Sequence, residues 1–144
     1  MAYTISDANA SFTLAITSLF PAPQNLRYFG ADDAFATENV KPSEVKMGVD
    51  GHQSVGYASH PTIIKIKLAA DSPSNQLFDL WYLAQKTTLD AYTASAVIKL
   101  PSIGQEYIGI NGALTGYMPM APAKKILQER EFEITFESLT PAGV

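Results

Sequence analysis

Cysteine is absent from the 144 residues, and its absence excludes disulfide bonds, thiolate nucleophiles and thiolate metal sites. The fold must therefore be held by packing and hydrogen bonds. Positive charge is also scarce, because ten lysines and arginines stand against fourteen acidic residues and the formal net charge is −4. Proteins that grip nucleic acid phosphates need clustered lysine and arginine, so this class of protein is disfavoured.

Long apolar runs are absent as well, and no stretch approaches the length needed to cross a bilayer. The first twelve residues have no basic residue ahead of an apolar run, so we expect neither a secretory signal nor membrane insertion. Apolar residues make up 47% of the chain and charged residues only 17%, a balance typical of folded proteins. We therefore expect one folded domain over residues 1–144.

Constellations that would indicate catalysis are missing too. His52 and His60 lie in one expected loop close to Asp50, but their spacing matches no compact metal pattern and a third ligand is lacking. No serine sits in a nucleophile-elbow sequence, and no glycine loop with a following lysine is suited to a phosphate. We expect no catalytic site, no metal and no cofactor, with a small histidine-dependent hydrolase as a minor alternative.

Alternating apolar and polar residues are present in several segments and predict a mostly β fold. The clearest are the run from Ser11, the run IIKIKL from Ile63, and the run from Arg130 to Glu137, which places Phe132, Ile134 and Phe136 on one face. A further strand from Gln105 contains three glycines, which predict bulges or a close backbone approach.

Residues 34–70 read as one long hairpin, with Asp50-Gly51 favouring a turn at its tip. The expected tip loop, VDGHQSVGYASH, is too long for a tight turn, and loops of this length are usually mobile or have a partner. We therefore expect the tip to contact another subunit or ring, through Met47, Gly48, Val49, Asp50, Gly51, His52, Val55 and Tyr57.

One helix is predicted from Pro73 to about Thr88, with Ser72 as its N-cap. Its main apolar stripe consists of residues spaced three and four apart, namely Leu77, Leu80, Trp81 and Ala84. Phe78 and Tyr82 lie roughly opposite this stripe, so they are expected either beneath a loop or at an interface with a neighbour.

The segment from Gly48-Val49-Asp50-Gly51 through the strand IIKIKLA to the helix start DSPSNQLFDLW resembles the tail tube proteins of contractile bacteriophage tails. More distantly it is similar to the tubes of R-type pyocins and type VI secretion. The resemblance implies a two-sheet β-sandwich or barrel that forms hexameric rings, which stack into a tube for DNA. It also implies assembly in the host cytoplasm, a place in the virion tail, and sheath, tape-measure and baseplate proteins as partners.

The lumen of such a tube would be lined by one sheet face. Glu131, Glu133 and Glu137 share one face of the last strand, and a ring of copies would multiply them into a negative stripe past which DNA slides. Lys65 and Lys67 form a cationic face that would line the channel instead, or pair with the glutamates across an interface. A carbohydrate- or receptor-binding virion module with glycine-rich loops and tyrosines is the alternative function.

Overall fold

The computed structural model describes residues 10–17, 19–26 and 35–142, and it is built from strands with one α-helix. The helix, α1, spans Asn75–Thr88, and a short 3-10 turn, η1, spans Pro101–Ile103. The strands are β1 (Ser11–Ile16), β2 (Phe20–Asn25), β3 (Phe35–Thr37), β4 (Ser43–Met47), β5 (Gln53–Tyr57), β6 (Thr62–Leu68), β7 (Ala94–Leu100), β8 (Gln105–Tyr117), β9 (Arg130–Phe136) and β10 (Ser138–Pro141).

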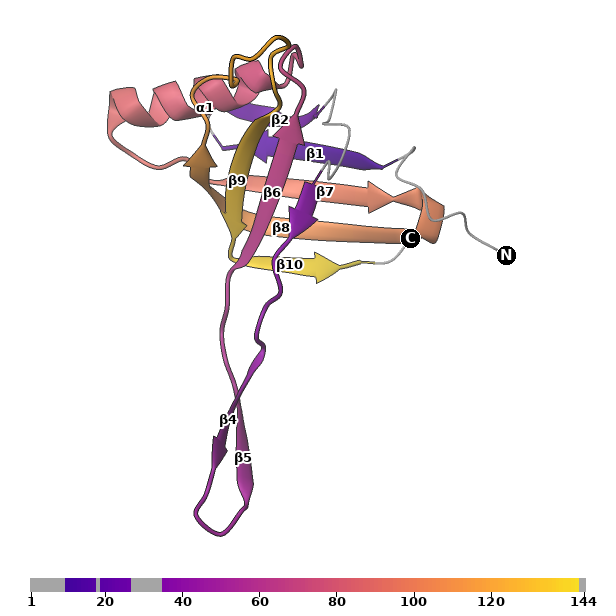
Figure 1. The fold of residues 1–144 in the computed structure, drawn as a ribbon, viewed down its shortest axis with the longest axis vertical. Helices are drawn as coiled ribbons and strands as arrows, with labels where there is room; N and C mark the ends of the chain where they lie inside the picture. Colours follow the sequence, from indigo (N-terminus) through magenta and orange to yellow (C-terminus); the bar gives the residue numbers. More distant parts are fainter. Residues whose placement is uncertain (1–9, 18, 27–34, 143–144) are drawn as a thin grey trace.

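Eight strands form one antiparallel sheet in the order β2-β1-β7-β8-β9-β6-β3, with β10 paired to β8, and β4-β5 form a second, two-stranded sheet. The large sheet folds into two layers: β1, β7, β8 and β10 run across the molecule, whereas β9, β6 and β3 run along its long axis in front of them (Figure 1). Its end strands β2 and β3 are not paired with each other, so the sheet is not closed into a barrel. The prediction of a mostly β, layered fold with one helix and a long preceding hairpin is confirmed.

The long strand β8 joins the two layers because its first half pairs with β7 and its second half with β9. Register shifts between Ala94 and Ala96 and between Leu114 and Gly116 are the bulges that the glycines predict. At Gly112 an added Cβ would lie 2.6 Å from a ring carbon of Phe136. Glycine is therefore needed there because β8 turns directly over a core aromatic ring.

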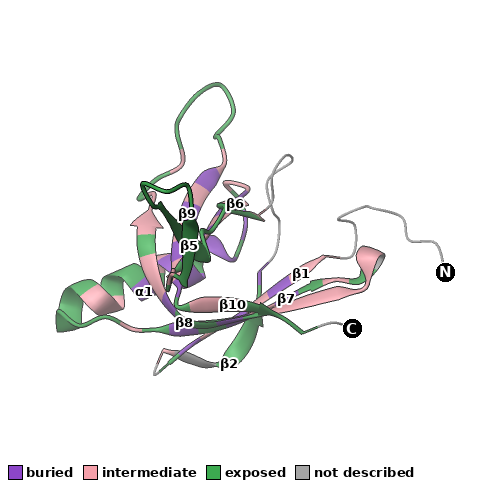
Figure 2. Ribbon diagram, turned by 90° about the horizontal axis from the view of Figure 1, so that it is seen from below, coloured by how far each residue is buried: buried purple, intermediate pink, exposed green. Residues whose placement is uncertain are grey.

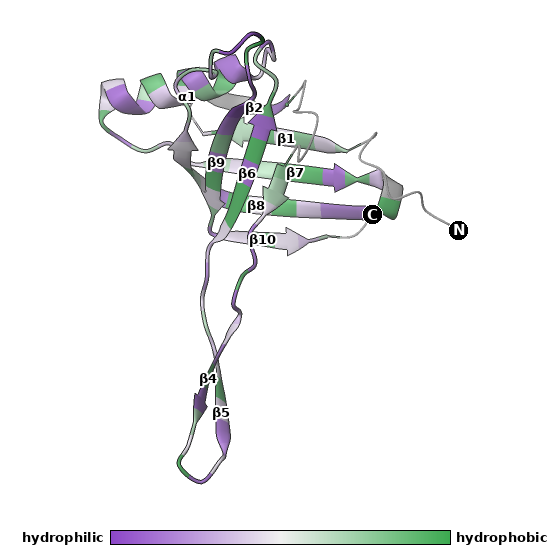
Figure 3. Ribbon diagram, viewed as in Figure 1, coloured by the Kyte–Doolittle hydropathy of each residue, from purple (hydrophilic) through white to green (hydrophobic). Residues whose placement is uncertain are grey.

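The core lies between the two layers. Alternate residues of β1, β6 and β9 are fully buried, as the sequence pattern predicts: Phe12, Leu14, Ile16, Ile64, Ile66, Leu68, Phe132, Ile134 and Phe136. Burial of each side chain of this size contributes about 1.5–3 kcal/mol to the free energy of folding. The same alternation follows β6 and β9 when the ribbon is coloured by hydropathy (Figure 3). Register between these strands is therefore fixed by which residues face the core.

Helix α1 begins two residues later than the sequence predicts, because Ser72 and Pro73 form a preceding turn. The amides of Asn75 and Gln76 donate to the carbonyl oxygens of Ser72 and Pro73 at 3.2 and 3.3 Å, and Ser74 is the N-cap. The helix ends at Thr88, and its C-cap residue Leu89 has a left-handed backbone with φ 56°.

The buried face of α1 is broader than the predicted stripe. Leu77 and Trp81 are buried as expected, but Phe78 is also fully buried, and its ring stacks on Phe132 with centroids 4.2 Å apart. The prediction of Phe78 as an interface residue is therefore wrong, because this side of α1 packs against β9 and the Phe78 ring is buried there. Leu80, predicted to be in the stripe, is instead 40% exposed.

Candidate assembly surfaces

Residues 38–61, which we call the hairpin arm, project away from the two layers along the long axis of the molecule (Figure 1). The arm is rooted in the core because β3 and β6 pair beneath it, from Thr37↔Ile64 to Phe35↔Ile66. Beyond this root β4 and β5 pair with each other alone. The long hairpin predicted over residues 34–70 is therefore present in the described part of that range.

The tip of the arm is tighter than the sequence predicts. Strand β5 occupies much of the expected loop, so the turn is confined to residues 48–52. The Gly48 amide donates to the His52 carbonyl oxygen at 2.7 Å, and the Gly51 amide donates to the Gly48 carbonyl oxygen at 3.0 Å. Asp50 accepts a hydrogen bond from the His52 amide at 3.1 Å, and Gly51 supplies a positive φ of 86°. His52 thus belongs to a structured turn.

The arm has two chemically different faces. Residues that pair directly share a face, and the register places Val45 opposite Val55, with Met47 and Tyr57 on the same side. These four side chains are 62%, 65%, 62% and 81% exposed, in the order Val45, Val55, Met47 and Tyr57. Glu44, Lys46 and Ser54 occupy the other face. We call the first side the apolar face of the arm.

An apolar face of this kind is not accounted for by the fold of a single chain. All residues from Val40 to Tyr57 are exposed, and β5 carries the colour of exposed residues in Figure 2. A two-stranded hairpin alone is at best marginally stable in water, and contiguous exposed apolar side chains usually mark an interaction site. The arm is therefore the strongest candidate contact surface in the described part of the chain.

The charged face of the long-axis strands carries both signs. Lys65 lies opposite Glu133 and Lys67 opposite Glu131 in the pairing of β6 with β9. Lys65 also forms an ion pair with Glu38, Nζ to Oε1 3.3 Å, and the hydrogen bond with Glu38 raises the pKa of Lys65. The alternatives in which glutamates and lysines form separate faces are therefore wrong, because the two strands are neighbours in one sheet. Glu137 follows β9 and is exposed.

A polar clamp joins α1 to the adjoining ends of β8 and β9. The guanidinium of Arg130 contacts Asp79, with Nη2 2.8 Å from Oδ1, and donates to the carbonyl oxygens of Met118 and Pro119. The Tyr117 hydroxyl also donates to Asp79. Tyr82 covers this cluster, since its ring stacks on Tyr117 with centroids 4.3 Å apart. Tyr82 remains 36% exposed and is still a candidate interface residue.

The electrostatics of the clamp favour the charged forms of Asp79 and Arg130 and the neutral form of Tyr117. Burial alone raises the pKa of the Asp79 carboxyl, but the hydrogen bonds from Arg130 and Tyr117 outweigh it and the pKa is lowered. The pKa of Tyr117 is raised, first by burial and then by its hydrogen bond to Asp79. The sequence gives no signal for this cluster, because Asp79 and Arg130 are 51 residues apart. The clamp fixes the helix on the sheet and offers no open site for chemistry.

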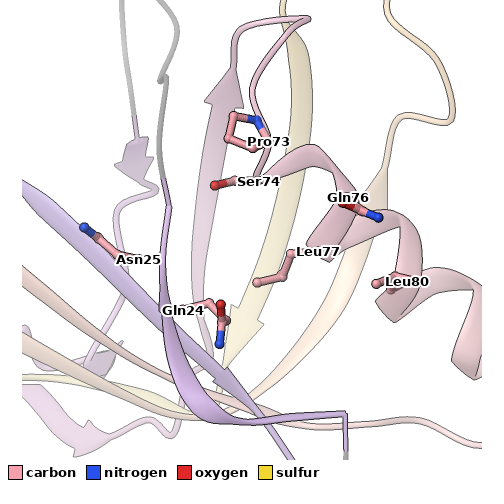
Figure 4. Close-up of a pocket in the computed structure, with 7 residues that line it drawn as sticks. All are labelled: Gln24, Asn25, Pro73, Ser74, Gln76, Leu77 and Leu80. Atoms are coloured by element: carbon pink, nitrogen blue, oxygen red, sulfur yellow. The ribbon is translucent and has the colours of Figure 1, made fainter.

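A shallow hollow lies between β2 and the start of α1. Leu77 of α1 and Gln24 of β2 point toward each other across it (Figure 4). The lining residues are Gln24, Asn25, Pro73, Ser74, Gln76, Leu77 and Leu80. Its polar lining side chains are amides and one hydroxyl, which can donate and accept hydrogen bonds.

Sites for metals are not assembled in the described ranges. His52 lies in the turn of the arm and His60 at its root, and no group of three metal-type side chains converges among the residues described. The helix among these residues is too short and too polar to span a membrane. What this part of the chain presents is a set of surfaces suited to contact.

The sequence matches the family model of the tail fiber protein gp32 over residues 3–140. The chain belongs to this family. No curated protein matches this gp32-family chain in sequence. Membership therefore identifies a bacteriophage-type tail protein, in agreement with the resemblance that the hairpin and helix segments indicate.

The fold of the gp32-family chain is also that of chains in contractile injection systems. It is similar to a chain of the six-fold symmetrised baseplate of the anti-feeding prophage, with a TM-score of 0.63, 11% identity, and 100% and 99% of the two chains covered. A chain of the PVC sheath/tube terminator gives 0.62, 10% identity and 99% coverage of both chains. A chain of the PVC sheath-tube complex gives 0.56, 11% identity, and 92% and 88% coverage. The family thus gives a bacteriophage-type tail protein, and the similar structures show that its fold also occurs in contractile injection systems.

Proposed function

We propose that this protein is a structural tail protein that assembles with copies of itself into rings, which stack as the inner tube of a contractile tail. The observation that carries the proposal is the hairpin arm, whose apolar face has no partner within the described chain. Assembly would cover this face and order a ribbon that is marginal on its own. The protein acts in this proposal by its shape and contacts, without catalysis or cofactor.

The similar structures support this proposal in two ways. One relative is a chain of a baseplate with six-fold symmetry and another is a chain of a sheath-tube complex, and both match nearly the whole fold. We infer a hexameric ring from the first and a place inside a sheath from the second. Sheath, tape-measure and baseplate proteins are the further partners that this role requires, in a virion tail assembled in the host cytoplasm.

The charged face of β6 and β9 suits the lumen of such a tube. Three carboxylates, of Glu38, Glu131 and Glu133, accompany the two ammonium groups of Lys65 and Lys67. Opposite charges on adjacent strands nearly cancel, so a ring lined by this face would have little net attraction for DNA phosphates. In this proposal one carboxylate per copy is left unbalanced, so the wall is weakly negative and DNA phosphates slide past it without binding.

A receptor- or carbohydrate-binding virion module is the second candidate, and two observations favour it. The family is described as a tail fiber protein. The hollow beside α1 is lined in part by Gln24, whose amide can both donate and accept hydrogen bonds, as sugar hydroxyls require. A binding module of this kind does not account for the hairpin arm. The tube subunit therefore remains the first candidate function.

Electron microscopy of the purified full-length protein separates the two candidates. The tube proposal expects rings or stacked tubes in negative stain, with a concentration-dependent sedimentation profile. A protein that stays monomeric at high concentration in several buffers would contradict the tube proposal. A sugar-dependent rise in melting temperature for such a monomer would favour the second candidate.

A further inference from the structure

The space between the two layers is covered differently at its two ends. At the end beside α1, Phe78 and Trp81 of the helix are fully buried and close it. At the opposite end, where β7 and β10 end (Figure 1), several side chains that face the core are only half-buried. These are Phe35, Leu100, Tyr107 and Leu139. Protein cores are close-packed, so this end lacks part of its cover.

A hollow of about 340 Å³ lies at this second end. It is lined from the long-axis strands by Phe35, Thr37 and Ile64, and from the crossing strands by Ile98, Leu100 and Tyr107. No charged side chain is among the described residues that line it. Water is a poor occupant of such a space, because an ordered water needs two to four polar partners. The hollow is therefore suited to apolar side chains.

The part of the chain that precedes β1 starts beside this hollow. Ser11, the first residue of β1, pairs with Lys99, and Lys99 is followed by Leu100 in the wall of the hollow. Residues 1–9 come before this point and lie outside the described residues. Nine residues reach up to about 30 Å when extended, which is well beyond the span of a hollow of this volume. The segment is therefore long enough to turn back over the opening.

The sequence of this segment has the pattern of a strand with one apolar side. Met1, Tyr3 and Ile5 are large and apolar, and they alternate with small or polar residues. Alternate residues of an extended chain share one side, so the large side chains would point the same way. Asp7 and Asn9 follow, and both residue types favour turns. The sequence thus places a turn signal between this apolar run and β1.

We propose that residues 1–6 cover the hollow of their own chain, with the side chains of Tyr3 and Ile5 packed between the two layers. The segment would close this end of the core as Phe78 and Trp81 close the other. Residues 1–6 carry no charged side chain, so none would be buried against the apolar wall. The inference goes beyond the proposed function, because it concerns each copy alone and does not depend on assembly.

Alanine substitutions in the full-length protein test which side of the segment is buried. Y3A/I5A should lower the melting temperature by at least about 5 °C, because two large side chains would be lost from a buried site. It should also increase the fluorescence of ANS, which binds exposed apolar surface. The matched control T4A/S6A changes the other side of the same segment and should melt within about 1 °C of wild type.

Two results of this comparison would overturn the proposal. The first is a melting temperature of Y3A/I5A equal to that of wild type, which would show that Tyr3 and Ile5 cover nothing. The second is an equal loss in Y3A/I5A and T4A/S6A, which would show that the apolar side of the segment is not the buried one. If Y3A/I5A does not fold, a cross-link decides the question, because the cysteine variants leave Tyr3 and Ile5 in place.

Cross-linking identifies the chain that supplies the segment, since the wild-type sequence contains no cysteine. T4C/T37C places one thiol in the segment and one on an exposed residue at the edge of the hollow. A short bismaleimide should join them within one chain, giving a linked product that migrates as a monomer on a denaturing gel. The control T4C/I126C moves the second thiol to the loop before β9, where Ile126 is 78% exposed, and should not be linked within the chain.

A mixture of the single variants T4C and T37C separates the possible sources. If each segment covers the hollow of its own chain, the mixture gives no covalent dimer. Dimers from the mixture, without an internal link in T4C/T37C, would assign the hollow to the segment of a second copy and overturn the proposal. No link in either sample, or an equal internal link in T4C/I126C, would also overturn it.

Discussion

The apolar face of the hairpin arm can be tested by placing a charge on it. Val55 and Ser54 are adjacent in β5 and point to opposite faces of the ribbon. V55D puts a carboxylate on the apolar face, and S54D puts the same carboxylate on the polar face as a matched control. Both residues are exposed in the monomer, so each change should alter the free energy of unfolding by no more than about 0.5 kcal/mol.

The expected effect on assembly is much larger for V55D. Val55 is 65% exposed, and full burial of a valine side chain contributes about 1.5–3 kcal/mol, so about 1–2 kcal/mol is available on assembly. Each 1.4 kcal/mol is a tenfold change in affinity. An unpaired carboxylate forced into the contact adds a desolvation cost of several kcal/mol. We therefore expect V55D to raise the critical concentration for assembly about 100-fold or more.

Critical concentrations can be measured by sedimentation over a dilution series, with negative-stain images of each pellet. S54D should assemble within about threefold of wild type, since an exposed carboxylate on the polar face meets no apolar partner and costs less than 1 kcal/mol. Equal critical concentrations for V55D and S54D would show that the arm does not use its apolar face in assembly. The reasoning from the register and exposure of β5 would then be refuted.

The remaining predictions concern the helix and its clamp. F78A should destabilise the protein by about 3–5 kcal/mol in denaturant titrations, because Phe78 is fully buried and stacked on Phe132, whereas Y82A should cost about 1 kcal/mol or less. If Y82A were the more costly change, the assignment of Phe78 to the core would be wrong. D79N should lower stability by about 1 kcal/mol at neutral pH, discounted for the partial exposure of Asp79. Because the folded pKa of Asp79 is lowered, its contribution is present above the unfolded pKa of about 3.9 and lost as pH falls through the folded value. The difference in melting temperature between wild type and D79N should therefore shrink below about pH 4, and a difference that persists there would contradict the clamp.

Local patterns of apolar and polar residues predict most of the strands and their buried faces. The strict alternation of Phe132, Ile134 and Phe136 is enough to predict a strand with one buried face, and the structure confirms it. The same holds for Ile64 and Ile66 of β6. Such patterns indicate which residues are buried, because the face on which a side chain of a strand lies depends only on its position among its near neighbours in the sequence.

Relations between distant elements were beyond these patterns. Nothing near Lys65 indicates that its cross-strand neighbour is Glu133, since that depends on the pairing of β6 with β9. For the same reason the clamp between Asp79 and Arg130 was missed. The spacing of the apolar residues predicts Phe78 beneath a loop or at an interface, because a helical stripe is narrower than the face of α1 that this sheet buries. Packing of α1 against the sheet buries a wider face of the helix than the spacing of its apolar residues indicates, and no local pattern predicts this extra width.

The direction of β6 and β9 has a mechanical consequence. A pull between the arm and the opposite end of the molecule acts parallel to these strands, so it loads the seven register pairs from Thr62↔Phe136 to Leu68↔Arg130 in shear. Hydrogen bonds loaded in shear must yield together, whereas those at the end of a peeled strand yield one at a time. A filament of these subunits would thus transmit tension through its most resistant ladder, while the strands that cross the axis carry little of the force.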